Sequence, residues 1–316
     1  MEKGLEGRIL KNPTLLIAPR TFILSDDTRE DFYQDALERF IRRYDMLTQE
    51  CDVKVLGAKE DTDASHKYWR FIEDFEKLRP DAVIRLNVKS RRDTLATIWP
   101  RDVFQVYGDL VISTPGYEEK TREILLQLGV KLEGLKILSS NLGQGGYVVR
   151  DKNILILSSK VLEDPEIPHL KNKGYTIYFL PVPSEEDKDS DLVRRMSLNY
   201  HIDTEFNLVF SPDGNALICV NGGYYSRFQE QVDSIVEAIN GKMYIIPEDS
   251  VDAMKKATNF IKLPNGKVML PNYCSATQKF LEEGLGKNNV LVAEIDPATE
   301  YSGVGGGLRC MSNLIE

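Results

Sequence analysis

Short apolar segments alternate with polar turns along most of this chain, and the alternation recurs as one repeated pattern. From residue 82 onward, an apolar strand leads into a polar loop, and one polar residue then opens two more apolar strands joined by a tight turn. The residues that open these units are Asp102, Gln144, His201, Asn259 and Cys310. Spacings of 42, 57, 58 and 51 residues separate them, which fits one supersecondary unit per repeat.

The pattern predicts hairpins followed by further strands and helices. The hairpins are expected at Val103–Tyr107 with Leu110–Ser113, Tyr147–Val149 with Ile154–Leu157, Phe206–Phe210 with Ala216–Val220, and Phe260–Leu263 with Lys267–Leu270. The strands upstream of the loops are expected at Ala82–Leu86, Leu135–Leu138, Tyr175–Leu180, Met243–Ile246 and Val290–Ile295. Apolar spacing predicts helices at Arg29–Glu50, Glu118–Leu128 and Ser226–Ile239.

The fifth unit opens at Cys310 and runs out of chain at Glu316. Its missing strand is most simply supplied from the N-terminal region, by Thr14–Ala18 or by Phe22–Ser25, which would close the repeats into a ring. We therefore expect a single α/β domain over residues 1–316 whose five turns converge on one central site. Five polar residues at strand starts are also ordinary caps and turn formers, and for Asn259 this is the interpretation we adopt.

Composition narrows the classes of partner. The 316 residues include 40 basic and 49 acidic side chains, a net charge of −9 without a basic run, so no nucleic-acid partner is expected. The N-terminus lacks the apolar core of a signal peptide, and no apolar run is long enough to span a bilayer. The sequence predicts a cytoplasmic protein with no membrane partner. It does not decide whether the protein is a monomer or a homo-oligomer.

The sequence contains no motif that is typical of a metal site or of an organic cofactor site. The four cysteines are far apart and form no Cys-x-x-Cys pair, and three histidines accompany them. No phosphate-binding or dinucleotide-binding glycine motif leads into a helix, because the Gly303–Gly307 run ends near a cysteine. We therefore expect no metal and no cofactor.

Cys310 is the strongest candidate for chemistry. It follows the glycine-dense stretch Gly303–Gly307, where backbone and substrate can approach a thiol closely. A glycine-rich turn before a core cysteine would look the same. The segment from His201 to Glu205 adds an imidazole and two carboxylates, and period-two alternation would place His201, Asp203 and Glu205 on one face. A thiol, a histidine and carboxylates make a nucleophilic set.

The chain resembles the arginine deiminase and amidinotransferase superfamily. The resemblance rests on His-Ile-Asp-Thr at 201–204, Arg-Cys-Met-Ser at 309–312 after the glycine run, Trp-Pro-Arg-Asp at 99–102, and Gly145-Gly146 after Gln144. These motifs stand in the order of that superfamily and span residues from about 99 to the end. The resemblance implies a pentein fold, a five-bladed α/β propeller of pseudo-fivefold repeats.

The resemblance also implies a reaction and the roles of residues. Cys310 would attack a guanidinium carbon to give a covalent thiouronium, and His201 would act as acid and then base. Asp102 and Asp203 would hold the guanidinium, with Arg101 and Gln144 at the substrate. Gln144 stands where the family usually has glutamate. Glu205 is either a substrate-binding carboxylate that restores the lost negative charge or an ordinary solvated strand residue. The substrate would be a small guanidino compound such as arginine.

Three functions stay open on the sequence. The first is a hydrolase of the deiminase or dihydrolase type, in which water resolves the thiouronium. The second is an amidinotransferase with the same residues, in which an amine replaces the water. The third is a binding or regulatory homologue that has lost efficient catalysis, for which Gln144 is the sign.

Overall fold

The computed structural model describes residues 9–19, 29–58, 66–88, 93, 97, 99–182, 201–254, 256–295, 308–310 and 312–315, and these residues form five small sheets. The first sheet has the strand order β16-β1-β2-β3, with β1 (Thr14–Ile17), β2 (Asp52–Ala58), β3 (Val83–Leu86) and β16 (Ser312–Ile315). The other four sheets have three strands each. They are β4 (Phe104–Tyr107), β5 (Leu110–Ser113) and β6 (Lys136–Ser139); β7 (Val148–Asp151), β8 (Ile154–Ser158) and β9 (Thr176–Leu180); β10 (Phe206–Phe210), β11 (Ala216–Asn221) and β12 (Gly241–Ile246); and β13 (Ile261–Lys262), β14 (Val268–Pro271) and β15 (Val290–Ala293).

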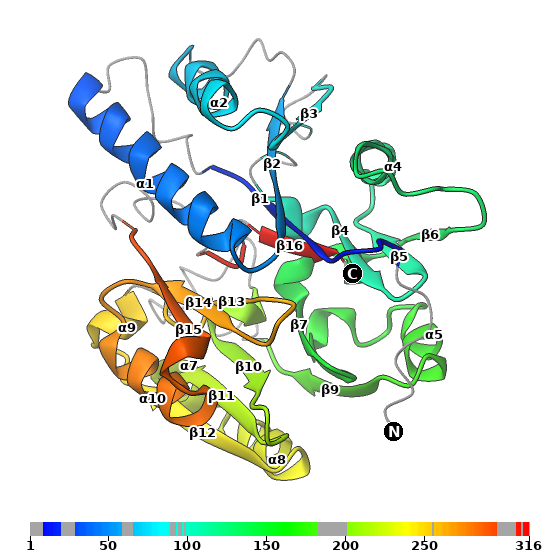
Figure 1. Cartoon of the computed structure of the whole chain (residues 1–316). Helices are drawn as coiled ribbons and strands as arrows, with labels where there is room; N and C mark the ends of the chain where they lie inside the picture. Colours follow the sequence, from blue (N-terminus) through cyan, green and yellow to red (C-terminus); the bar gives the residue numbers. More distant parts are fainter. Residues whose placement is uncertain are drawn as a thin grey trace, which may run out of the picture.

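Helices connect the parallel strands and lie toward the outside of the molecule (Figure 1). The α-helices are α1 (Glu30–Thr48), α2 (His66–Leu78), α4 (Glu118–Gln127), α5 (Ile167–Asn172), α7 (Gly222–Arg227), α8 (Gln229–Ala238), α9 (Val251–Met254) and α10 (Ser275–Leu285). The short 3₁₀ turns are η1 (Pro100–Asp102), η2 (Asn141–Gly143), η3 (Gly145–Tyr147), η4 (Ser159–Val161), η6 (Ile202–Thr204) and η7 (Lys287–Asn289).

Each three-stranded sheet has the same construction. Its first two strands form an antiparallel hairpin, and its third strand lies parallel to the second after a connection that carries a helix. A parallel pair needs such a crossover, whereas a hairpin needs only a tight turn. The grouping of strands into sheets differs from the repeat unit described for the sequence. The strand that precedes each polar loop belongs to the sheet of the preceding hairpin, and not to the sheet of the hairpin that follows the loop. Strand β3, for example, belongs to the first sheet and not with β4.

The two ends of the described chain meet in the first sheet. Strand β16 pairs antiparallel with β1, with Thr14 opposite Ile315 and Ile17 opposite Ser312. This confirms Thr14–Ala18 as a source of the strand missing from the fifth unit. The alternative, Phe22–Ser25, lies outside the described residues, as does the glycine run Gly303–Gly307.

Five hydrophobic clusters hold the sheets together, and each cluster is shared by two sheets. Leu16 of the first sheet and Phe104 of the second lie in one cluster. Ile112 of the second sheet and Leu157 of the third lie in another. Sheets three and four, and then four and five, are joined in the same manner. The remaining cluster contains Leu15 of the first sheet and Met269 of the last. Packing therefore runs from each sheet to the next and from the fifth back to the first.

The helices depart from the sequence prediction in two places. The apolar spacing of the helix expected over Arg29–Glu50 places Phe32, Ala36, Phe40 and Ile41 on its buried face. Helix α1 does bury Phe40, together with Tyr33 and Leu37, whereas Phe32, Ala36 and Ile41 are only partly buried. The helix expected over Ser226–Ile239 is divided into α7 and α8 at Phe228, which has φ −123° and ψ 35° and packs its ring against Tyr224. Within the described ranges, no helix is both long enough and apolar enough to cross a bilayer.

Candidate active site

Short turns present the polar residues that open the hairpins. Asp102 ends η1, Gln144 lies between η2 and η3, His201 is the N-cap of η6, and Cys310 lies in the turn before β16. A 3₁₀ turn commonly connects elements and changes the chain direction within three residues. The residues that are far apart in the sequence are thereby brought to the same end of neighbouring strands.

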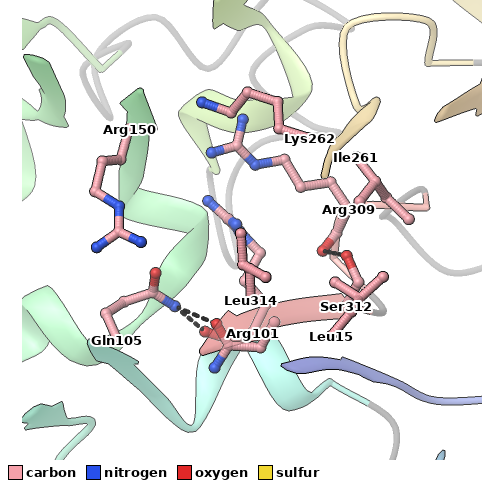
Figure 2. A pocket seen from close by; sticks show the side chains of 10 residues that line it. Leu15, Arg101, Gln105, Arg150, Ile261, Lys262, Arg309, Ser312 and Leu314 are labelled. Carbon is pink, nitrogen blue, oxygen red and sulfur yellow. Dashed lines mark hydrogen bonds between the residues drawn. The ribbon is translucent and has the colours of Figure 1, made fainter. Parts of the chain in front are cut away.

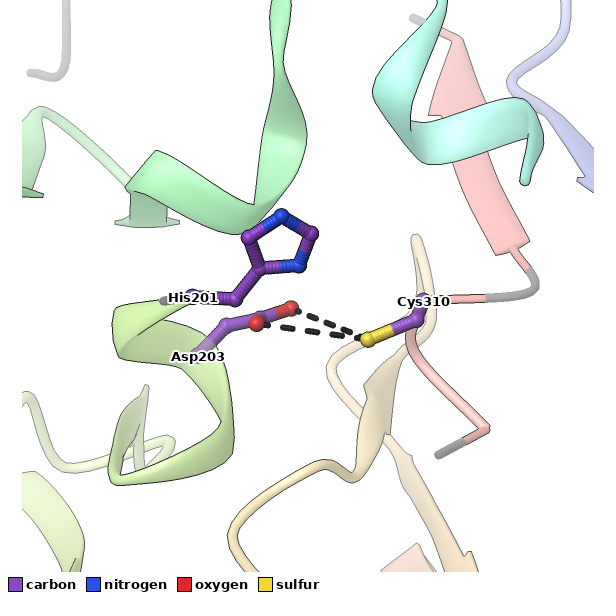
Figure 3. A group of neighbouring side chains, drawn as sticks. All are labelled: His201, Asp203 and Cys310. Carbon is purple, nitrogen blue, oxygen red and sulfur yellow. Dashed lines mark hydrogen bonds between the residues drawn. The ribbon is translucent and has the colours of Figure 1, made fainter. Parts of the chain in front are cut away.

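Two of these side chains, His201 and Cys310, form a compact cluster with Asp203. The thiol of Cys310, a ring nitrogen of His201 and a carboxylate oxygen of Asp203 all lie within 4.8 Å of one another. The Cys310 Sγ is 3.8 and 4.0 Å from the two carboxylate oxygens of Asp203 (Figure 3). Cys310 is 3% exposed and Asp203 is fully buried, whereas His201 is partly exposed. A reactant that enters from the solvent would therefore meet the imidazole at the border of the cluster.

Asn259, which the sequence indicates as an ordinary turn residue, holds the turn of Cys310 in place. Its Oδ1 accepts hydrogen bonds from the backbone N–H groups of Arg309 (2.9 Å) and Cys310 (3.3 Å). Its Nδ2 donates to the Asp203 carbonyl (3.1 Å) and to the Cys310 Sγ (3.3 Å). The side chain is fully buried. The sequence signal was its place at the same repeat position as the other four residues.

The backbone at Gly146 lies directly against His201. A Cβ at this position would come within 2.1 Å of the His201 Cγ, and one at Gly145 would come within 2.2 Å of the Arg101 Cγ. Only glycine permits these approaches, which explains the Gly-Gly pair. The Tyr147 ring packs edge-to-face on the imidazole at 5.8 Å between centroids.

Gln144 sets the orientation of the imidazole. Its Nε2 lies 2.9 Å from the Nε2 of His201, and an amide nitrogen only donates, so this ring nitrogen accepts. The neutral ring then carries its proton on Nδ1. Figure 3 shows one ring nitrogen on the side of Asp203 and Cys310 and the other turned away from them.

Asp102 lies beside this group. Its Oδ1 accepts a hydrogen bond from the Gly146 N–H at 3.3 Å. Desolvation raises the pKa of Asp102, the nearby Asp203 adds to the rise, and the positive charges of His201 and Arg101 oppose it. The structure therefore brings Asp102 and Gln144 to the border of the cluster.

Two arginines of the chain surround Asp203. The Arg101 Nε is 3.2 Å and the Arg309 Nε 4.0 Å from the Asp203 Oδ2. Arg101 also donates to the carbonyls of Gly145 (3.0 Å) and Val148, and Arg309 donates to Asn207 Oδ1. Both arginines are less than 10% exposed. We expected Arg101 at the substrate, but its guanidinium contacts are to the chain itself, and they fix Asp203.

The position of Glu205 differs from the expectation. Residues 202–204 form a 3₁₀ turn, in which successive side chains are rotated by about 120°, so His201, Asp203 and Glu205 do not share one face. Glu205 accepts a hydrogen bond from the Thr204 hydroxyl at 3.3 Å, and its Oε2 is buried without a hydrogen bond. Desolvation raises the pKa of Glu205 to about 7, and Lys256 opposes the rise. The side-chain hydrogen bond described for Glu205 is therefore to its neighbour Thr204.

His201, Asp203 and Cys310 include ligand types that hold metal ions. The surroundings do not fit a divalent metal ion, because the Asp203 carboxylate that would be its ligand already faces the guanidinium groups of Arg101 and Arg309. Asn259 also donates a hydrogen bond to the sulfur. The cluster is suited to nucleophilic chemistry and not to binding a divalent ion.

No family model and no curated protein matches this sequence. Solved structures do match in three dimensions. Agmatine deiminase from C. jejuni aligns with a TM-score of 0.61 at 13% identity, over 98% of this chain and 95% of its own. DDAH from Pseudomonas aeruginosa, in complex with citrulline, aligns with a TM-score of 0.55 at 15% identity, over 95% and 98% of the two chains.

The N-terminal domain of ArgZ, a cyanobacterial arginine dihydrolase, aligns with a TM-score of 0.58 at 13% identity, over 96% of this chain and 98% of that domain. That structure holds a covalently bound reaction intermediate. This chain has the fold of guanidino-modifying enzymes. The similarity suggested by the sequence motifs is thus confirmed at the level of the fold, across nearly the whole chain.

Proposed function

We propose that this chain is a hydrolase of a small guanidino compound that works through a covalent bond to Cys310. The observation that carries the proposal is the cluster of a thiol, an imidazole and a carboxylate within 4.8 Å, in a chain with the fold of guanidino hydrolases. A nucleophile with an acid/base group in reach and a third group that orients them is the pattern of covalent catalysis.

The reaction has two halves. The Cys310 thiolate forms a bond to the guanidinium carbon, the C–N bond breaks, and the leaving nitrogen takes a proton from the His201 imidazolium, which is left neutral. Water then gives a proton to His201 and forms a bond to the same carbon, and the S–C bond breaks. The products are a ureido compound and ammonia or an amine, and the thiolate is regenerated. Nδ1 of His201, which faces Cys310, is the ring nitrogen placed for both transfers. During the reaction Nε2 keeps its proton and donates it to the Gln144 amide oxygen, so the amide group is rotated by 180° from the orientation that serves the neutral Nδ1 tautomer.

Asp102 and Asp203 are the carboxylates proposed to hold the guanidinium. Asp203 already pairs with Arg101, so Asp102, which is partly exposed, carries the larger share of substrate contact. A planar cation between carboxylates is held by charge-assisted hydrogen bonds. Gln144 contributes no charge, and Glu205 and Arg101 are assigned to the support of the site.

We also propose that the five sheets are the blades of a closed propeller and that residues 1–316 form one domain. The support is the packing of each sheet on the next and the pairing of β16 with β1. In such a ring the turns that open the sheets gather near the axis, where Cys310, His201 and Asp203 lie.

The decisive experiment offers the purified protein agmatine, arginine and methylated arginines, and measures ammonia or amine together with ureido product. We expect turnover of at least one compound, and its loss in Cys310→Ser. Cys51→Ser is the matched control, because Cys51 is only half-buried and lies outside the cluster. Trapped substrate should add to the wild-type mass and not to Cys310→Ser.

Two other outcomes would replace the proposal. Product formation that requires an added amine would identify an amidinotransferase with the same residues. Absence of turnover and of any covalent adduct across the panel would identify a binding homologue, in agreement with the neutral Gln144.

A further inference from the structure

The buried Asp203 carboxylate has two cations beside it but receives almost no hydrogen bonds. Its Oδ2 lies 3.2 Å from the Arg101 Nε and 4.0 Å from the Arg309 Nε. Within the described ranges, the Cys310 thiol is the one donor whose hydrogen bonds reach this carboxylate, and they are long, at 3.8 and 4.0 Å. The charge of Asp203 is therefore paired, whereas most of its lone pairs are not used.

The N–H groups of both arginines are directed at neutral acceptors. The Arg101 Nε donates to the Gly145 carbonyl at 3.0 Å, and its Nη2 donates to the Val148 carbonyl. Arg309 donates from Nη1 to the Asn207 Oδ1 and from Nη2 to the same Val148 carbonyl at 3.4 Å. The carboxylate thus receives the charge of the two groups, while their protons go to the backbone and to an amide.

The two guanidinium groups lie side by side, since both donate to the Val148 carbonyl and both line one pocket of about 60 Å³ (Figure 2). Buried like charges repel each other, and burial adds the cost of desolvation. Desolvation and then Arg101 lower the pKa of Arg309, and Asp203 is the first of the groups that oppose this change. The pair of cations is therefore stabilised by Asp203 in its ionised form.

Four further titratable groups face Asp203, namely Asp102, His201, Glu205 and Cys310. Asp203 raises the pKa of Asp102 and of Glu205, because ionised carboxylates repel one another. The imidazole of His201 favours an ionised Asp203 only while it carries a second proton. Arginine keeps its charge at every pH of interest, so Arg101 and Arg309 are the permanent cations at this carboxylate.

We propose that Arg101 and Arg309 are positioning residues that keep Asp203 ionised through their charge and leave its oxygens free to accept N–H groups of the substrate. The inference rests on the proposed function, in which Asp203 holds a guanidino group. A carboxylate kept ionised by two or three hydrogen bonds would have its lone pairs occupied before the substrate arrives. A buried carboxylate without a charged partner would take up a proton. The two arginines prevent both outcomes.

Infrared spectroscopy of the whole chain measures the ionisation of Asp203 without any substrate. The C=O band of the protonated acid is obtained as the difference between each protein and the same protein with Asp203→Asn. Arg309 is the residue to change, because Arg101 also supports the Gly145 turn next to the imidazole. We expect Arg309→Met to move the appearance of the band about 1 pH unit higher than in the wild type, since a neighbouring positive charge is lost.

Two variants control this measurement. Arg309→Lys keeps the charge and should stay close to the wild type. Lys262→Met removes a base from the lining of the same pocket, but the acidic neighbour of Lys262 is Asp151, at 3.7 Å, so the band should not move. The same band position in the wild type and in Arg309→Met, or no band in either, would overturn the proposal.

A double-mutant cycle keeps the test decisive if Arg309→Met is too unstable for spectroscopy. We expect the loss of melting temperature caused by Arg309→Met to be roughly twofold smaller when Asp203→Asn is also present, because no ionised carboxylate then loses its partner. If only the double variant folds, the pairing is supported. An equal loss in both backgrounds, or failure of both variants to fold, would overturn it.

Turnover separates this inference from the proposed function. In an active wild type, the acid limb of kcat/KM should move to higher pH in Arg309→Met and return in Arg309→Lys. An acid limb that does not move would remove Arg309 from the positioning of Asp203. A wild type without turnover would refute the proposed hydrolase, whereas the infrared band and the double-mutant cycle would still report whether the arginines keep Asp203 ionised.

Discussion

Single amide and glycine positions control how Cys310, His201 and Asp203 are placed in the candidate site. Asn259 binds the backbone of the Cys310 turn with its oxygen, and it binds the Cys310 sulfur and the Asp203 carbonyl with its nitrogen. No other described side chain connects the thiol turn to the Asp203 segment through both ends of its amide. The position of the thiol therefore depends on this side chain.

Replacement of Asn259 by Ala should lower kcat by roughly 100-fold, because small displacements of reacting groups have effects of that size. The rate of Cys310 alkylation by iodoacetamide should change as well, which gives a readout independent of the substrate. Asn265→Ala is the matched control, since Asn265 is exposed in the following turn. Unchanged kinetics in Asn259→Ala would remove Asn259 from the site.

Gly146→Ala should displace the imidazole, because the new Cβ would lie 2.1 Å from the His201 Cγ. We expect kcat to fall by about 100-fold while the circular dichroism spectrum is retained. Tyr147→Phe keeps the aromatic edge against the imidazole and should retain most activity. Wild-type turnover in Gly146→Ala would show that His201 tolerates movement and is not the acid/base.

Glu205 predicts a pH dependence of stability. Its pKa is raised to about 7 from an ordinary 4.5, so the folded state holds this proton more tightly than the unfolded state. The free energy of unfolding therefore falls as the pH rises from 4.5 through 7. Glu205→Gln should gain about 3 kcal/mol over the wild type at pH 8 and nothing at pH 4.

Urea unfolding at both pH values measures this difference. The exposed Glu283→Gln serves as the control and should show no such change. A Glu205→Gln variant that is less stable than the wild type at pH 8 would mean that the ionised carboxylate has a favourable partner in the folded protein.

At the scale of elements, buried asparagines connect the first strand of one sheet to the start of the next. Asn313 in β16 donates to the carbonyls of Pro100 (3.3 Å) and Phe104 (2.8 Å), ahead of and within β4. Asn207 in β10 donates to the carbonyls of Thr258 and Phe260 ahead of β13. Asn207 and Asn313 are each the second residue of their strand. The two repeats therefore have the same hydrogen-bonded connection to the next sheet as well as the same topology.

Asn313→Ala should cost about 1–3 kcal/mol of stability, because two buried carbonyls lose their donor. Chemical denaturation measures the change, and the exposed Asn141→Ala should stay within about 0.5 kcal/mol of the wild type. An Asn313→Ala variant as stable as the wild type would show that water replaces the lost donor and that these hydrogen bonds contribute little to stability.

The whole molecule is held by clusters that lead from each sheet to the next. If the arrangement is closed, a defect between the last and first sheets should affect the entire chain. Leu15→Ala in that cluster and Leu157→Ala between sheets two and three should each cost roughly 2–5 kcal/mol. Tryptophan fluorescence and far-ultraviolet circular dichroism should report one coincident transition in both variants.

The exposed Leu126→Ala is the control and should leave the stability nearly unchanged. A separate early transition in Leu15→Ala would show that the first sheet melts alone and that the ring is not closed energetically.

Local patterns in the sequence were sufficient for the repeats and their hairpins. Strands β5, β10 and β14 lie within a residue of their expected bounds, because alternating apolar positions and glycine or asparagine turns act over a few residues. The positions that open the sheets were also visible, and Cys310, His201 and Asp203 do meet. The pairing of β1 with β16 followed from the strand missing at the end of the fifth unit.

Tertiary structure alone decided what each polar residue contacts. The local sequence indicates that Asn259 is a turn former, whereas the structure shows that it supports the Cys310 thiol. Its partners lie about 50 residues away in the sequence, so no local pattern indicates them. The 3₁₀ turn at 202–204 places Glu205 on a different face from His201. The alternation of residues along the sequence predicts an extended segment and does not indicate this turn. Arg101, Arg150, Lys262 and Arg309 carry no shared motif, and they line one pocket only because packing between sheets brings four distant segments together.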